Sequence, residues 1–200
     1  MNNAQMNNAQ GDDFMLEDLS AHVLDIAENS VRAAARNVTV TVKESEAENL
    51  LLFSVEDDGK GMTKDFIAKV TDPFTTTRTT RKVGMGLPFL KQSAELCGGG
   101  LEIKSEVGVG TKTTATFEYS SVDRPPLGDI PTSVMTLIMG SPEIHWVYHH
   151  ITDGGEFSLD TDEILEALDG DRELMRSADV GLWICGTVRE GLDGIGWSGH

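Results

Sequence analysis

The sequence predicts an α/β fold, a two-layer sandwich in which helices cover one face of a mixed or mainly antiparallel sheet. Apolar residues recur at helical spacing in 14–35, and valine alternates with threonine in 37–43, as in a half-buried strand. The predicted elements then follow in the order helix, two strands, short helix, loop, helix, two strands. With 200 residues, of which 39% are hydrophobic, the chain is long enough for one packed domain and a small appendage.

The first predicted helix has two distinct faces. Its apolar stripe is formed by Leu16, Leu19, Val23, Ile26 and Ser30. Asp25, Asn29 and Arg32 are spaced i, i+4, i+7 and therefore share a second, polar face. On an isolated helix such a face would be ordinary solvated surface.

The next elements are separated by clear turn and cap residues. Strands are predicted over 37–43 and 51–57, and the second runs into an Asp-Asp-Gly turn. A short helix follows with Thr63 as its cap, and then a mobile loop over 71–86. A helix over 87–100 has Pro88 near its start and Gly98 past its end. Residues 101–120 are two strands joined by a Gly-Val-Gly turn.

Three segments define the predicted domain organisation. Residues 1–13 repeat a polar five-residue unit, so we expect disorder there and exclude them from the fold. Residues 14–120 form the main domain. A proline-rich boundary then precedes a small α+β module over 121–200, with helices at 132–140, 161–170 and 172–192 and a hairpin at 143–160. In that hairpin His145 and His149 would lie about 13 Å apart, too far to share one ion.

Charge and composition exclude several classes of partner. The 16 basic and 33 acidic residues give a formal charge of −17, which disfavours nucleic acid and anionic membranes. Two cysteines do not make a disulfide framework, and no apolar run has the length of a membrane span. The first residues lack the features of a signal peptide. We therefore expect a cytoplasmic protein.

Two glycine-rich turns stand out, "VEDDGKGM" at 55–62 and "VGMGLPFL" at 83–90. Such turns usually approach a phosphate or another backbone. A Walker loop needs Gly-Lys-Ser/Thr, which the chain lacks, and neither turn has the third glycine of G-x-G-x-x-G.

Four boxes in a fixed order resemble the GHKL superfamily of ATP-binding proteins, which includes DNA gyrase, heat-shock chaperones, histidine kinases and MutL. They are "DIAENSVRA" (25–33), "DDGKG" (57–61), "DPFTTTR" (72–78) and "GMGLP" (84–88), and "GVGTKT" (108–113) resembles the closing turn. Each box alone is weak, but together they are specific. The resemblance implies the Bergerat fold and ATP with Mg²⁺ as ligands.

The resemblance also implies a role for each box. The nucleotide site would comprise Asn29, Arg32, Asp57, Gly59, Gly61, Met62, Thr77, Arg78, Lys82, Gly84, Met85, Gly86, Leu87 and Thr111. Asp57 would accept a hydrogen bond from the adenine amino group, whereas guanine would present a carbonyl and be repelled. Asn29 would ligate Mg²⁺, and the second glycine turn would bind phosphate at a helix N-terminus. Asp58 is expected to be only a solvated turn residue.

The candidate catalytic residue is Asp25. In the gyrase and MutL branches a glutamate stands four residues before the metal asparagine, whereas histidine kinases usually have asparagine there. Asp25 is one methylene shorter, so it is either a general base with altered reach or a residue that binds magnesium indirectly, outside the ion's own ligands. Glu28 would point about 100° away around the helix.

We expect a histidine kinase-like phosphotransferase or an ATPase that acts in trans on a partner protein. His22 lacks the sequence context of a phosphoacceptor, and no acceptor domain is recognised. The alternative is an ATP-gated binding module with little turnover, in which the loop between the boxes closes over the phosphate. The partner could be a redox enzyme or a signalling protein, and a homodimer is also compatible with the sequence.

Overall fold

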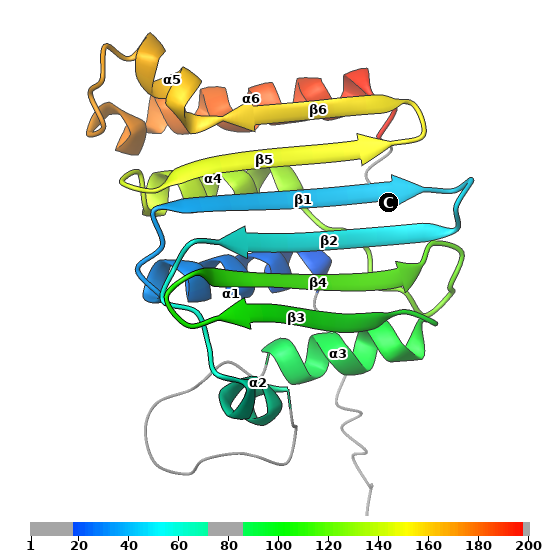
Figure 1. Ribbon diagram of the computed structural model, residues 1–200. Coiled ribbons are helices and arrows are strands. Elements are labelled where there is room, and N and C mark those ends of the chain that lie inside the picture. Colours follow the sequence, from blue (N-terminus) through cyan, green and yellow to red (C-terminus); the bar gives the residue numbers. More distant parts are fainter. Residues whose placement is uncertain (1–17, 72–85, 198–200) are drawn as a thin grey trace, which may run out of the picture.

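The core of the protein is a single mixed sheet. The structure is a computed structural model that describes residues 18–71 and 86–197. Six strands of this part of the chain lie in the order β3-β4-β2-β1-β5-β6 (Figure 1). Their bounds are β1 Asn37–Ser45, β2 Leu50–Asp57, β3 Gly100–Glu106, β4 Gly110–Glu118, β5 His145–Thr152 and β6 Gly155–Asp160. Neighbouring strands are antiparallel except β1 and β5, which are parallel.

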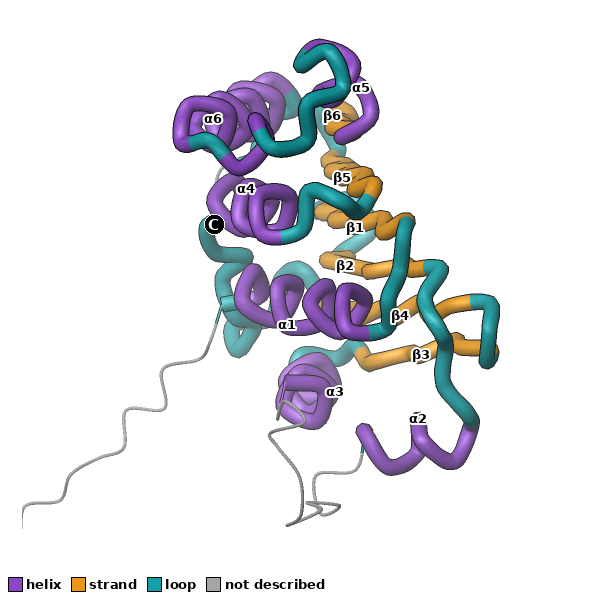
Figure 2. Tube along the Cα trace, turned by 90° about the vertical axis from the view of Figure 1, so that its left-hand side faces the viewer, coloured by secondary structure: helices purple, strands orange, loops and turns teal. Residues whose placement is uncertain are grey.

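Four helices lie side by side on one face of this sheet (Figure 2). They are α1 Leu19–Arg32, α3 Gly86–Leu96, α4 Ile130–Gly140 and α6 Ala178–Gly194. Under them, the alternating valines of β1 are buried, and Phe53 of β2 stacks on Phe117 of β4 with ring centroids 6.3 Å apart. The predicted two-layer sandwich is therefore confirmed. No helix in the described residues has the length and apolar character needed to cross a bilayer.

The start of α1 is completed by a distant segment. The Asp18 carboxylate accepts a hydrogen bond from the amide of Ala21 at 3.0 Å. The amides of Leu19 and Ser20 donate to the carbonyls of residues 126 and 127 at 3.0 and 2.9 Å. Because the first amides of a helix have no partner within it, residues 126–127 stabilise this end. The helix ends at Arg32, earlier than the predicted residue 35, because Ala34 adopts a φ of 58°.

The other predicted helices and strands are present, with one correction, whereas the predicted disordered segment 1–13 and residues 72–85 of the predicted loop lie outside the described residues. α2 (Lys64–Val70) is capped by Thr63, and Gly98, with a φ of 72°, follows α3. The single helix predicted over 172–192 is wrong. It is a 3-10 helix, η1 (Leu174–Arg176), followed by α6, with a break at Ser177. Ser177 is extended, and its hydroxyl accepts a hydrogen bond from the amide of Val180 at 3.3 Å, so it caps α6.

Residues after 121 extend the same sheet. β5 pairs with β1 over seven residue pairs, from Asn37 with His145 to Lys43 with Ile151. β6 then pairs with β5, and α5 (Thr161–Ala167) follows it directly. The expected accessory module at 121–200 therefore contributes strands beside the main domain, while the predicted domain limits themselves stay a prediction.

A buried polar chain crosses the β1–β5 junction. Tyr148 and His150 of β5 face the helices together with Glu44 of β1. The Tyr148 hydroxyl lies 2.6 Å from His150 Nδ1, and His150 Nε2 lies 2.8 Å from Glu44 Oε1. Burial and the nearby Glu44 carboxylate raise the pKa of Tyr148 well above its usual value. The phenol thus keeps its proton, and each ring nitrogen of His150 has a partner.

Candidate functional site

The candidate site lies where β2 ends. Asp57 is the last residue of β2 and is paired with Thr111 of β4 on one side. Its Oδ2 accepts a hydrogen bond from the Ser30 hydroxyl of α1 at 2.8 Å, and its Oδ1 accepts one from the amide of Gly59 at 2.9 Å. Two neighbouring elements thus fix the orientation of the carboxylate. Each oxygen still has a lone pair available for a ligand.

The turn after Asp57 is packed tightly between α1 and the β3–β4 hairpin. A Cβ on Gly59 would lie 2.7 Å from the Cβ of Ala33, and one on Gly61, whose φ is 65°, would lie 1.9 Å from the carbonyl oxygen of Glu106. A Cβ on Gly110, in the closing glycine turn, would lie 1.9 Å from the carbonyl oxygen of Asp57. All three glycines therefore allow backbones to approach at this end of the sheet.

These elements enclose an open pocket of about 750 Å³. It is lined by α1, by the turn after β2, by α2 and by the starts of α3 and β4. Seven of the predicted nucleotide residues line it: Asn29, Arg32, Asp57, Gly61, Met62, Leu87 and Thr111. Gly59 is held against Asp57 beneath the pocket. The volume is within the range of small-molecule sites.

Asn29 and Arg32 lie at the pocket rim and contact each other. Arg32 Nη1 donates to Asn29 Oδ1 at 3.2 Å, and Arg32 Nη2 forms an ion pair with Glu28 at 2.7 Å. The amide oxygen predicted to ligate a metal is therefore exposed and already oriented by a neighbouring cation. Glu28 is engaged with Arg32 on the helix surface.

Asp25 lies one turn before Asn29 and contacts the start of α3. A Cβ on Gly86 would lie 2.6 Å from Asp25 Oδ2, so the absence of a side chain at Gly86 lets the carboxylate approach the helix. Asp25 is exposed, although it is not among the residues that line the pocket. Thr77, Arg78, Lys82, Gly84 and Met85 were also predicted to bind nucleotide, and they lie outside the described residues.

Sequence reasoning missed several residues that build the site. Ser30 was assigned only to the buried stripe, yet it bonds Asp57. The Ser105 hydroxyl accepts a hydrogen bond from the Met62 amide at 2.8 Å and lies 2.8 Å from the Thr111 hydroxyl. Phe66, which is 49% exposed, adds an apolar wall from α2. A hydroxyl on an otherwise apolar helix stripe was a usable signal for Ser30.

The prediction that Asp58 is only a solvated turn residue is wrong. Its Oδ1 accepts hydrogen bonds from the amides of Arg36 and Asn37 at 2.7 and 2.9 Å, and its Oδ2 accepts one from Asn37 Nδ2 at 2.7 Å. Partial burial opposes ionisation, but the bonds from Asn37 and Arg36 outweigh it and lower the pKa of Asp58. Asp58 therefore holds the start of β1 against the end of β2.

Comparison with known proteins agrees with the fold. The family described as histidine kinase-, DNA gyrase B-, and HSP90-like ATPase matches residues 16–121. This match covers more than half of the chain, and the chain belongs to that family. It thus carries a GHKL-type ATP-binding domain related to the catalytic regions of histidine kinases.

Several curated relatives are histidine kinases that match through one segment. Sensor histidine kinase WalK of Bacillus subtilis is 33% identical over 111 residues, which are 52% of this chain and 18% of that kinase. Sporulation kinase D of the same organism is 26% identical over 99 residues, 50% of this chain and 19% of that protein. Probable histidine kinase 5 of Oryza sativa subsp. japonica is 36% identical over 88 residues, which are 40% of this chain and 7% of that kinase. The chain thus spans a fifth or less of these relatives.

Proposed function

We propose that this chain binds Mg-ATP in the pocket beside Asp57 and uses it to phosphorylate a partner protein or to hydrolyse ATP. The observation that carries the proposal is the Asp57 carboxylate, held by Ser30 and Gly59 at the wall of a 750 Å³ pocket. A fixed acceptor suits the adenine amino group and repels the carbonyl oxygen of guanine. A hydrogen bond to a charged group contributes roughly 1.5–3 kcal/mol.

The rim of the pocket suits a metal-bound triphosphate. The exposed amide oxygen of Asn29 is a neutral oxygen ligand of the kind that Mg²⁺ accepts. Bound Mg²⁺ would neutralise phosphate charge. Lys60 and Arg32 bring positive charge to the pocket, and α3 begins at Gly86 with Leu87 in the pocket wall. The amides at the start of a helix bind phosphate. We assign Thr77, Arg78, Lys82, Gly84 and Met85 to the same phosphate region.

Asp25 is the candidate general base for the acceptor side chain or water. It is exposed and lies against Gly86, at the helix start to which we assign the phosphates. The described histidines do not suit a phosphoacceptor within the domain: His22 is 5% exposed, His150 is fully buried, and both His145 nitrogens are bonded. His149 is partly exposed, but it lies on β5, and no residue of β5 lines the pocket. We therefore favour transfer to a partner protein, either a signalling protein or a redox enzyme.

A second function, ATP-gated binding with little turnover, is favoured by the state of α2. This helix lines the pocket through Phe66 and Val70 but has no buried residue. A nucleotide against Phe66 would supply contacts that α2 otherwise lacks, so ligand binding would stabilise α2 selectively. A partner that recognises ordered α2 would then sense ATP.

Two isosteric substitutions test the proposal and separate the functions. Asp57→Asn should weaken ATP binding at least about tenfold in calorimetry, because it replaces the charged acceptor. Asp25→Asn should leave binding unchanged but lower phosphate release or transfer from γ-labelled ATP by about 100-fold. Glu28→Gln is the matched control, since it removes the adjacent carboxylate.

The outcomes distinguish each assignment. Unchanged ATP affinity in Asp57→Asn would remove the basis of the nucleotide site. Loss of turnover in Glu28→Gln but not in Asp25→Asn would move the base to Glu28. Tight ATP binding without phosphate release or transfer to any protein would favour the gated module.

A further inference from the structure

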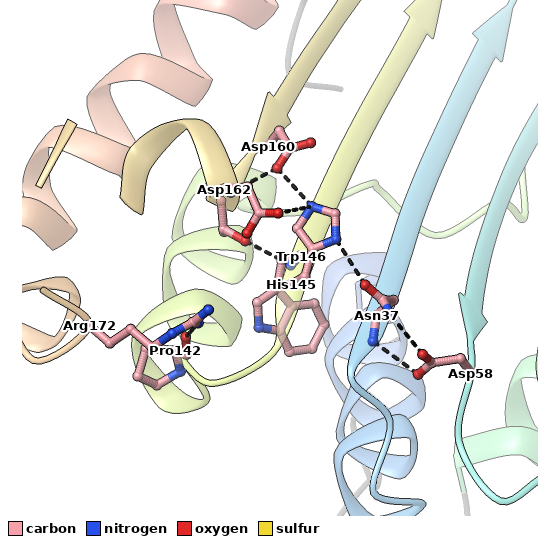
Figure 3. Close-up of polar contacts among 9 residues, drawn as sticks. Asn37, Asp58, Pro142, His145, Trp146, Asp160, Asp162 and Arg172 are labelled. Atoms are coloured by element: carbon pink, nitrogen blue, oxygen red, sulfur yellow. Dashed lines mark hydrogen bonds and ion pairs between the residues drawn. The ribbon is translucent and has the colours of Figure 1, made fainter. Parts of the chain in front are cut away.

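A cluster of one histidine and two carboxylates lies at the β5–β6 edge of the sheet (Figure 3). His145 begins β5, Asp160 ends β6 and Asp162 lies in the first turn of α5. His145 Nε2 lies 2.8 Å from Asp160 Oδ1 and 3.7 Å from Asp162 Oδ2, and the three ligand atoms lie within 4.8 Å of one another. The three side chains are 29%, 36% and 64% exposed, so the cluster is open to solvent.

The hydrogen bonds around His145 fix its tautomer. Its Nδ1 lies 3.0 Å from Asn37 Oδ1. Asn37 Nδ2 donates to Asp58 Oδ2, and a carboxylate in its ionised form only accepts, so the orientation of the Asn37 amide is determined. Its Oδ1 must therefore accept, and His145 Nδ1 must carry the proton that is donated. In the neutral ring, Nε2 then carries a lone pair, which points at two carboxylates.

His150, on the opposite face of the same strand, shows the satisfied alternative. Its two nitrogens have one donor and one acceptor partner, the Tyr148 hydroxyl and the Glu44 carboxylate, so a neutral ring fits there without a cation. At His145 the remaining nitrogen has only acceptors around it. Because of this difference, the space between His145 Nε2 and the two carboxylates suits a positive charge.

We propose that His145 Nε2, Asp160 and Asp162 bind a divalent transition-metal ion of the Zn²⁺ class. One imidazole nitrogen with two carboxylate oxygens suits Zn²⁺, Mn²⁺ or Co²⁺, whereas Mg²⁺ and Ca²⁺ prefer oxygen ligands alone. Ligand atoms around tetrahedral zinc are separated by about 3.4 Å, given bond lengths of about 2.1 Å. The two observed distances from Nε2, 2.8 and 3.7 Å, lie on either side of this value.

A divalent ion balances the local charge better than a proton on Nε2. A proton forms one short bond, to Asp160, and leaves Asp162 at 3.7 Å without a direct partner in the cluster. Across the described residues, no lysine or arginine forms an ion pair with Asp160 or Asp162. A divalent ion would contact all three ligands and neutralise both carboxylates.

The site also has the outer hydrogen bond that metal-binding histidines use. Such a histidine donates its other ring N–H to a carbonyl or carboxylate oxygen, which fixes the ring for the metal. Here Asn37 accepts from His145, and Asn37 is itself held by Asp58. These partners do not depend on nucleotide binding, so the proposal stands apart from the proposed function.

Calorimetric titration of the full chain with ZnCl₂ tests the site, after chelator treatment and in excess Mg²⁺ to occupy all-oxygen sites. We expect one equivalent to bind. His145→Gln and Asp162→Asn should each weaken binding by about 100-fold, at least the loss seen for outer partners. His149→Gln is the matched control, because it removes the histidine four residues along the same strand.

Asp162→Asn guards against a folding artefact, because Asp162 is 64% exposed while Asp160, not Asp162, caps α5. Co²⁺ in place of Zn²⁺ should give visible d–d bands that disappear in both ligand variants and persist in His149→Gln. Equal Zn²⁺ affinity in all four proteins, or no binding to the unmodified chain, would overturn the proposal and leave only the contact between His145 and Asp160.

Discussion

At the scale of single residues, Gly61 is required for two separate reasons. Its φ of 65° lies in the left-handed region, and a Cβ there would meet the Glu106 carbonyl oxygen at 1.9 Å. Gly108 shares only the first reason, because its φ is 81° but its Cβ would meet no atom within 4 Å. The two glycines thus separate the effect of backbone strain from that of a collision between the turn after β2, which lines the pocket, and the β3–β4 turn.

We expect Gly108→Ala to lower the free energy of unfolding by about 1 kcal/mol, the cost of a left-handed alanine. Gly61→Ala should lower the free energy of unfolding by about 1–3 kcal/mol more, because the β3–β4 hairpin must move aside. It should also weaken ATP binding, since Lys60 and Met62 would shift in the pocket wall. Denaturant unfolding and calorimetry measure both effects. Equal destabilisation by the two variants would show that the contact with Glu106 relaxes freely.

Sequence alone predicted the residues whose chemistry is local. Asp57 could be singled out because it begins the "DDGKG" box, which stands in order with the other boxes that resemble the GHKL superfamily. Asp58 could not be assigned, because its partners are the amides of Arg36 and Asn37, 21 or more residues away. His145 meets Asn37 only through the β1–β5 pairing, across 108 positions. Such contacts depend on strand order, which local patterns do not encode.

At the scale of elements, caps decide where helices begin. Ser177 divides the segment predicted as one helix into η1 and α6 because its hydroxyl accepts a hydrogen bond from a backbone amide. α4 begins in the same way at Asp129, whose carboxylate accepts from the Thr132 hydroxyl at 2.7 Å and from the Thr132 amide at 3.1 Å. The pKa of Asp129 is lowered, chiefly by the Thr132 hydroxyl; burial opposes this, and the Thr132 amide and Arg189 support it.

This cap should make the stability of α4 depend on pH. Because the folded-state pKa of Asp129 lies below the unfolded value of about 3.9, its contribution is complete above that pH and is lost as pH falls through the folded pKa. We expect Asp129→Ala to cost about 1 kcal/mol at pH 7. The cost should shrink on acidification, when measured by urea unfolding at several pH values.

The exposed carboxylate of Asp123, in the preceding loop, provides the control. Asp123→Ala should change stability by only a few tenths of a kcal/mol at neutral pH. If the stability lost in Asp129→Ala stayed constant down to about pH 2, the charge of Asp129 would contribute nothing to the cap.

At the scale of the whole molecule, the C-terminal strands are built into the family domain. β1 lies between β2 and β5, so half of its backbone groups pair with residues beyond 121. The α1 start is bonded by residues 126–127, and the buried Glu44–His150–Tyr148 chain joins β1 to β5. The proline-rich boundary predicted an appended module but not its place in the sheet, because a linker and a strand-connecting segment have the same composition. Only the parallel pairing distinguishes them.

We therefore expect the full chain to unfold in one cooperative transition, with equal calorimetric and van't Hoff enthalpies in differential scanning calorimetry. ATP at 100 times its dissociation constant should stabilise the whole transition by about 2.7 kcal/mol, because the ligand binds only the folded chain. The C-terminal strands should gain this protection too, seen as slower amide exchange in β5, although no residue of β5 lines the pocket. Two transitions, of which ATP shifts only one, would instead show that residues 121–200 fold independently. Unchanged amide exchange in β5 would show that the shared sheet does not couple these residues to the nucleotide site.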